Sequence, residues 1–113
     1  MSLAIRAVAE PMKSLGFASI GAAYMGVGTI YQHAIRILIL QNFTDKLVFF
    51  SFDGINDHIA APANSYMIID LATNKTVPQG FYFAEGSRIY VKAESALPTL
   101  GSVYSSAIYG VDL

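Results

Sequence analysis

The sequence predicts an all-β protein, folded as a single β-sandwich or jelly-roll-like domain of about seven or eight short antiparallel strands. Three observations support this class. The apolar and aromatic runs from residue 33 onward are short, and turns rich in Gly, Asn, Asp and Pro separate them. None of these runs has the period of a long helix. The length of 113 residues also fits one domain, which we divide into an extended amino-terminal arm, residues 1–17, and a sandwich, residues 18–113.

The arm and the segment that follows it form the least regular part of the sequence. Residues 15–31 contain no charged residue, but they include four glycines together with serine and threonine. A membrane-spanning helix needs about 20 predominantly apolar residues, so we expect no membrane insertion. The glycines instead predict bends between two short apolar stretches, residues 18–24 and 27–31. We expect the arm to reach onto a neighbouring subunit.

The first long strand is predicted over residues 33–41, which are apolar on both faces except at Arg36. This pattern is typical of a central strand that is covered on both sides. A second strand follows over residues 46–52. Between the two strands, the fold is expected to turn at Asn42, Thr44 and Asp45. We therefore expect a hairpin.

The second of these strands begins with residues 46–50, Lys-Leu-Val-Phe-Phe. High β-propensity with a single charge makes such a run prone to aggregate when it lies on an exposed sheet edge. It should therefore lie inside its sheet. We expect either Val48 and Phe50, or else Leu47 and Phe49, to be nearly fully buried.

The remaining strands follow at short intervals. Asp53, Gly54 and Asp57 are expected to define the next turn, because Asp, Asn and Gly favour the backbone angles of tight turns. Residues 88–93 alternate polar and apolar side chains, with Ile89 and Val91 on the inward face. The other expected elements are strands at residues 59–62, 65–71, 81–84 and 102–109 and a turn at Asn74.

The composition limits the kinds of partner. Seven Lys and Arg against eight Asp and Glu give a formal net charge of −1, which offers no basic surface to a nucleic-acid backbone. The absence of cysteine excludes disulfides, thiolate zinc sites and thiol nucleophiles. Hydrophobic residues make up 54% and charged residues 13% of the chain, whereas a typical soluble domain is about 25% charged. We therefore expect part of the apolar surface to lie against another subunit.

The sequence contains few residues for catalysis or metal binding. His33 and His58 are the only histidines, and no nucleophile motif accompanies them. A metal site would need further ligands from Asp53, Asp57 or Glu85, and their spacing does not support one. The turn at residues 53–57 lacks the spacing of a calcium loop. We therefore expect no enzyme activity, no cofactor and no metal.

Seven tyrosines and seven phenylalanines suggest contact surfaces. Tyrosine combines an apolar ring with a polar tip and is enriched at interfaces between subunits. Aromatic faces also stack on sugars, so a carbohydrate-binding or receptor-binding module of a tail or surface structure is an alternative. The candidate interface residues are Tyr24, Tyr31, Tyr82, Tyr104 and Tyr109.

Several short motifs resemble those of small virion structural proteins of tailed bacteriophages, over about residues 20 to 110. The matching residues are Asn42, Thr44 and Asp45; Ser51, Phe52, Asp53, Gly54 and Asp57; Gly86, Ser87 and residues 89–92; and Pro98 with residues 101–104. The resemblance implies a β-sandwich that decorates or cements the capsid, or that belongs to the head-to-tail junction or the tail. It implies homo-oligomers, contacts with the major capsid protein or with portal-proximal or tail proteins, and location in a virion assembled in the host cytoplasm. It implies no catalytic residues.

Overall fold

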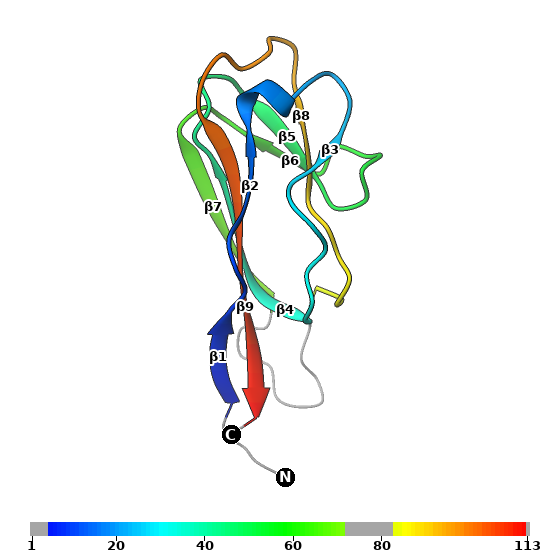
Figure 1. The fold of residues 1–113 in the computed structure, drawn as a ribbon, viewed down its shortest axis with the longest axis vertical. Helices are drawn as coiled ribbons and strands as arrows, with labels where there is room; N and C mark the ends of the chain where they lie inside the picture. The colour runs from blue at the N-terminus through cyan, green and yellow to red at the C-terminus, as the bar shows by residue number, and fades with distance from the viewer. Residues whose placement is uncertain (1–4, 72–82, 113) are drawn as a thin grey trace.

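The computed structural model describes residues 5–71 and 83–112, with the backbone alone at Ile5 and Asp112. It is an all-β protein in which two antiparallel sheets pack together, and it measures 51 × 22 × 22 Å (Figure 1). This confirms the predicted β-sandwich class. Nine strands lie in the described ranges: β1 (Ile5–Ala9), β2 (Lys13–Gly16), β3 (Met25–Gly26), β4 (Ile35–Asn42), β5 (Val48–Ser51), β6 (Ile59–Ala61), β7 (Ser65–Asp70), β8 (Tyr90–Ala93) and β9 (Ser102–Asp112).

The strands form two sheets, here named sheet A and sheet B. Sheet A has the order β1-β9-β4-β7, and β2 also pairs with β9 beyond the end of β1. Sheet B has the order β3-β8-β5-β6. The predicted turn at Asn74 lies outside the described residues, and the predicted strand at residues 81–84 lies partly outside them. Within that strand, Phe83 is described, and it forms an isolated bridge with Ile35.

The core lies between the two sheets. Sheet A contributes Leu38, Leu40 and Val103, and sheet B contributes Val48 and Phe50, all of them at most 1% exposed. The predicted burial of Val48 and Phe50 is therefore confirmed, and Leu47 on the opposite side is 36% exposed. Ile89 and Val91 also face the core, as their alternation with polar residues predicts.

The hairpin predicted from residues 33–41 and 46–52 is wrong, because β4 belongs to sheet A and β5 belongs to sheet B. The connection between them crosses from one sheet to the other, and the β6–β7 connection crosses back at the same end. Asn42 joins the two crossings, since its Nδ2 donates to the carbonyl oxygens of Lys46, at 2.8 Å, and of Ala61, at 2.8 Å. A buried side chain therefore takes the place of hairpin pairing.

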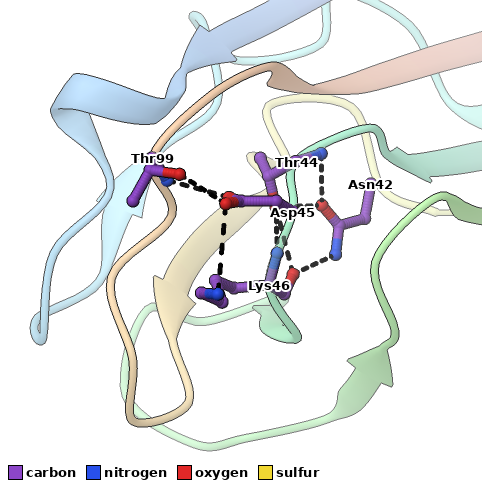
Figure 2. A network of polar contacts seen from close by, with 5 residues as sticks. All are labelled: Asn42, Thr44, Asp45, Lys46 and Thr99. Atoms are coloured by element: carbon purple, nitrogen blue, oxygen red, sulfur yellow. Dashed lines mark hydrogen bonds and ion pairs between the residues drawn. The ribbon is translucent and has the colours of Figure 1, made fainter.

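Figure 2 shows the polar network at this end of the sandwich. The Asn42 Oδ1 accepts hydrogen bonds from the backbone N–H of Thr44 at 3.0 Å and from its hydroxyl at 2.6 Å. The carboxylate of Asp45 accepts from the backbone N–H of Thr99 at 2.8 Å and from the Thr99 hydroxyl. Asp45 thereby ties the β4–β5 connection to the loop that precedes β9.

Residues 5–16 belong to the predicted arm, and the structure pairs residues 5–9 and 13–16 with β9 of the same chain, as β1 and β2. This part of the arm is a sheet edge rather than a free segment. The next residues form a short 3-10 helix, Phe17–Ser19, and the two-residue strand β3. No helix within residues 5–71 and 83–112 has the length and hydropathy to cross a membrane.

Candidate interaction surface

Strand β4 is apolar on both faces, but the described chain covers only one of them. Leu38 and Leu40 face the core and are buried. Ile37 and Ile39 alternate with them, point to the other side of sheet A and are half-buried. An antiparallel sheet with one face in water usually alternates apolar and polar residues. The outer side of β4 departs from that rule.

Neighbouring strands extend this apolar surface. Ile108 of β9 lies directly opposite Ile37, and Ile68 of β7 lies directly opposite Ile39. The exposed fractions of Tyr66 and Ile68 are 66% and 60%. Directly opposed residues of an antiparallel pair have side chains on the same face. The surface, here named the outer face of sheet A, consists of Ile37, Ile39, Tyr66, Ile68, Tyr104 and Ile108.

Charge is confined to one end of this face. We compared the outward positions of residues 37–42 in β4, 66–70 in β7 and 104–108 in β9. Asp70, which lies opposite Ile37, is the only charged residue among them. Gln41 lies between Tyr66 and Tyr104 at the other end. Apolar and aromatic side chains at the centre with polar groups around them are typical of interfaces between protein subunits.

The outer side of sheet B is different. Lys92 of β8 places its Nζ 4.9 Å from the centre of the Tyr24 ring and 3.2 Å from a carboxylate oxygen of Asp57. Arg88 lies over the Tyr90 ring. Charges of both signs therefore accompany the aromatic residues of sheet B, as expected of a surface in water. The contrast singles out sheet A as the candidate interface.

The outermost part of sheet A is a two-stranded ribbon. Residues 5–7 of β1 pair with residues 110–112 of β9, beyond Tyr109, the last β9 residue that pairs with β4. Figure 1 shows β1 and the carboxyl-terminal end of β9 extending together from one end of the molecule. We name residues 5–9 and 108–112 the β1–β9 ribbon.

A buried carboxylate holds the base of this ribbon. The side chain of Glu10 is 3% exposed and lies 3.1 Å from the Nδ1 of His33. The backbone N–H groups of Gln32 and His33 also donate to it, each at 3.0 Å. The His33 ring stacks on the ring of Tyr109 with 3.6 Å between centroids. Glu10 thus joins the β1–β2 connection to β9 and to the segment before β4.

The structure places the candidate tyrosines in different environments. Tyr104 lies on the outer face of sheet A, and Tyr109 lies at the base of the ribbon. Tyr24 donates to Asp57 on the sheet B side. Tyr31 needs correction as an interface residue: it is fully buried in its own chain, and its hydroxyl is hydrogen-bonded to Ser105. Tyr82 lies outside the described residues.

Burial also changes the acidity of Tyr31. Removal of its hydroxyl from water raises the pKa, and the nearby Glu10 carboxylate raises it further, while the hydrogen bond with Ser105 acts in the opposite direction. The neutral phenol is therefore the stable form, as a core position requires.

The turn residues Asp53, Gly54 and Asp57 lie in the loop between β5 and β6. Asp53 Oδ1 accepts from the backbone N–H groups of Ile55 at 2.8 Å and Asn56 at 2.9 Å, and these bonds hold the pKa of its carboxyl well below its ordinary range. Gly54 has a φ of +76°, which favours glycine. The pKa of Asp57 is lowered by Tyr24 and then by Lys92. These contacts explain the loop as structure.

The same applies to the histidines. His58 Nδ1 lies 3.0 Å from the backbone N of Phe52, from which it accepts, and its ring stacks on the Phe52 ring. Among the residues that the structure describes, no three His, Asp or Glu side chains gather in a group that could hold a metal ion. No buried side-chain nitrogen or oxygen in those ranges lacks a hydrogen-bond partner. None of the described buried polar groups therefore points toward a ligand.

Sequence reasoning missed two parts of this surface. The segment at residues 65–71 was predicted as a strand, but only its position at the end of sheet A exposes Tyr66 and Ile68. The Glu10–His33 contact joins residues 23 apart and follows from the fold alone. The one signal in the sequence was the apolar character of both faces of residues 33–41.

In comparisons with known proteins, no family model, curated protein or solved structure matches this chain.

Proposed function

We propose that the chain is a non-enzymatic structural protein of a bacteriophage particle. In this proposal it stabilises the capsid, as a cement or decoration protein, or the head-to-tail junction, through repeated contacts with its own copies and with other virion proteins. The observation that carries the assembly role is the outer face of sheet A, where Ile39 and Ile68 lie side by side in the middle of the surface and Asp70 lies at its end. We infer the location in a bacteriophage particle from the resemblance of the turn motifs to those of virion proteins.

The physical reason is the free energy of covering apolar surface. Each Å² of apolar surface that leaves water contributes about 25 cal/mol, and stable interfaces bury about 800 Å² on each partner. An isolated copy leaves Tyr66 and Ile68 mostly in water. In a closed ring or shell the same contact is repeated around a symmetry axis, so a modest interface suffices.

The test compares two isoleucine-to-lysine variants. Ile39→Lys places a charge in the centre of the outer face, while Ile55→Lys makes the same change in the β5–β6 loop, where Ile55 is 80% exposed. Light scattering and electron microscopy of the full chain should show multimers of the 12.2 kDa subunit. Ile39→Lys should shift assembly to at least about tenfold higher protein concentration, and Ile55→Lys should leave it unchanged.

A second measurement addresses the particle itself. Bacteriophage particles that encode the chain are purified by density banding. Mass spectrometry of these particles should detect the chain at a fixed ratio to the major capsid protein. A monomer at high concentration that is also missing from such particles would refute the proposal. Circular dichroism of Ile39→Lys shows whether the variant is folded, so that a lost assembly is not mistaken for a lost fold.

A carbohydrate-binding or receptor-binding module is the second candidate. The β5–β6 loop supports it, because this loop lies between Tyr24, which donates to Asp57, and Tyr90, whose ring lies against Gly54. Aromatic rings beside carboxylate and amide groups suit sugar recognition. Binding on a glycan array that Tyr24→Ala abolishes and Tyr66→Ala preserves would favour this function over assembly.

A further inference from the structure

The two ends of sheet A have backbone groups directed away from the sheet. β1 and β7 end the strand order, and no described strand pairs with the outer side of either. The backbone N–H of Glu10 donates to the carbonyl of Ala107 at 3.0 Å. Because the direction of these bonds alternates along a strand, Val8 also bonds to β9, and Ala7 and Ala9 direct their N–H and C=O groups outward.

The same reasoning applies to β7. The backbone N–H of Leu71 donates to the carbonyl of Arg36 at 2.7 Å. Met67 and Ile69 share this phase and bond to β4, so Tyr66 and Ile68 direct their backbone groups outward. Proteins usually protect such edges with proline, a bulge or charged side chains, above all lysine. Neither β1, Ile-Arg-Ala-Val-Ala, nor β7, Ser-Tyr-Met-Ile-Ile-Asp, contains proline or lysine.

The β1–β9 ribbon adds a reason for a partner. An isolated two-stranded ribbon is marginally stable in water, and three or more strands with an apolar face are needed for stability. Glu10 and His33 hold its base, but residues 5–7 and 110–112 have only each other as strand partners in the described chain. A third strand along β1 would form hydrogen bonds with the outward backbone groups of β1 and would stabilise the ribbon.

We propose that this third strand is β7 of a second copy of the chain. The inference rests on the proposed assembly function and adds a second contact to the outer face of sheet A: the outer edge of β1 in one copy pairs antiparallel with the outer edge of β7 in the next. Sheet A then continues from copy to copy. Such a head-to-tail contact uses a different edge on each side, so it builds a ring where the rotation closes and a filament where it does not.

Strand direction supports this pairing. Each step along β1, β9, β4 and β7 reverses the chain, so β1 and β7 run antiparallel to each other. A second copy in the same orientation therefore presents its strand in the direction that continues the sheet. No rotation of the partner by a two-fold axis is needed.

Side-chain size and charge favour the same pair. Ala7 and Ala9 lie on the same face as Ile108, the outer face of sheet A, and Tyr66 and Ile68 lie on that face at the other edge. Small residues on one strand thus meet large residues on the other. The single charged residue of β1 is Arg6, and that of β7 is Asp70. Pairing β1 with β1, or β7 with β7, would bring like charges to one face of the seam, whereas the β1–β7 pair places Arg6 and Asp70 on opposite faces.

The experiment uses the absence of cysteine in the natural chain. Ala7→Cys and Ile68→Cys are prepared as separate full-length variants, mixed in equal amounts and oxidised. Mass spectrometry then separates mixed from like disulfide dimers, because the two variants differ in mass. We expect mixed dimers to exceed like dimers by at least about tenfold, since the head-to-tail seam places unlike strands together. The pair Ala7→Cys with Tyr66→Cys covers a register shifted by two residues.

Like dimers in excess, or no mixed dimer from either pair under conditions where the chain is multimeric, would overturn the inference. A second comparison tests the backbone directly. Ala7→Pro removes an outward N–H without removing a bond to β9, and Ala7→Ser keeps that N–H. Loss of multimers in Ala7→Pro alone is expected, with both variants folded by circular dichroism. Unchanged assembly of Ala7→Pro would refute the β1–β7 seam while the assembly role survives, whereas a monomeric natural chain would remove both.

Discussion

At the scale of single residues, Asn42 has the largest structural task of any side chain in the polar network. It is fully buried, and its amide group uses both its donor and its acceptor inside the chain. The carbonyls that it satisfies belong to two connections between the sheets, at Lys46 and at Ala61 and Pro62. Removing the side chain would take one donor from each of these carbonyls, and the hydroxyls of Thr44 and Ser65 would still donate to Lys46 and Pro62.

We therefore predict that Asn42→Ala lowers the free energy of unfolding by about 2–4 kcal/mol. The matched change Asn56→Ala, at an exposed side chain that donates to Asp53 at 2.8 Å, should cost less than about 1 kcal/mol. Denaturant unfolding measures both. Equal losses in the two variants would show that Asn42 does not hold the crossing connections together.

Asp53 gives a prediction about pH. Its hydrogen bonds with the N–H groups of Asn56 and Ile55 lower its pKa from the ordinary value of 3.8. A carboxyl whose pKa is lower in the folded chain stabilises the fold above its unfolded pKa and loses that effect as pH falls through the folded pKa. Asp53→Asn should therefore be less stable than the natural chain at pH 7, and the difference should shrink below about pH 4. Thermal melts between about pH 2 and 7 test this, and a difference that stays constant would contradict it.

At the scale of elements, the loop that leads into β9 depends on a close backbone approach. Gly101 has a φ of +85°, and a Cβ there would lie 2.0 Å from the carbonyl oxygen of Phe43. Gly86 has nearly the same φ, +87°, with no atom within 4 Å of the corresponding position. The two glycines therefore separate the cost of backbone conformation from the cost of contact.

We predict that Gly86→Ala costs about 1–2 kcal/mol, the ordinary penalty for a side chain at positive φ. Gly101→Ala should cost at least about 3 kcal/mol, because the β4–β5 connection must also move away. Chemical denaturation of the two variants provides the comparison. Similar values for both would mean that the loop before β9 yields easily.

The elements also show what the sequence could predict. Alternation along residues 88–93 predicted which side chains are buried, because burial follows from a period of two within one strand. For residues 46–50 the same period predicted a buried alternating pair, and the structure shows which of the two pairs it is. The choice of partner strand did not follow. The short connection after β4 has the residues of a hairpin turn. The amide of Asn42, however, supplies hydrogen bonds to a connection that crosses between the sheets, so a crossing is as well hydrogen-bonded as a hairpin. Local patterns carry no information about that choice.

At the scale of the whole molecule, the outer sides of the two sheets differ in charge and in apolar character. Sheet B carries Lys92 and Asp57 in contact on its outer side, while the outer face of sheet A has its isoleucines at the centre. The sequence predicted the surplus of apolar surface from composition, but it could not locate that surplus. The position depends on which strand lies at the end of sheet A, and strand order depends on contacts between residues distant in the chain.

The burial of Asn42 has a practical consequence for producing the protein. Asn42, Phe43 and Thr44 fit the Asn-x-Thr acceptor sequence for N-linked glycans. The nitrogen that would carry the sugar is the Nδ2 that donates to Lys46, Ala61 and Pro62 inside the fold. A secretory eukaryotic host that modified this nitrogen before folding would yield chains unable to close this end of the sandwich, so a bacterial host without that pathway is the suitable source of native material.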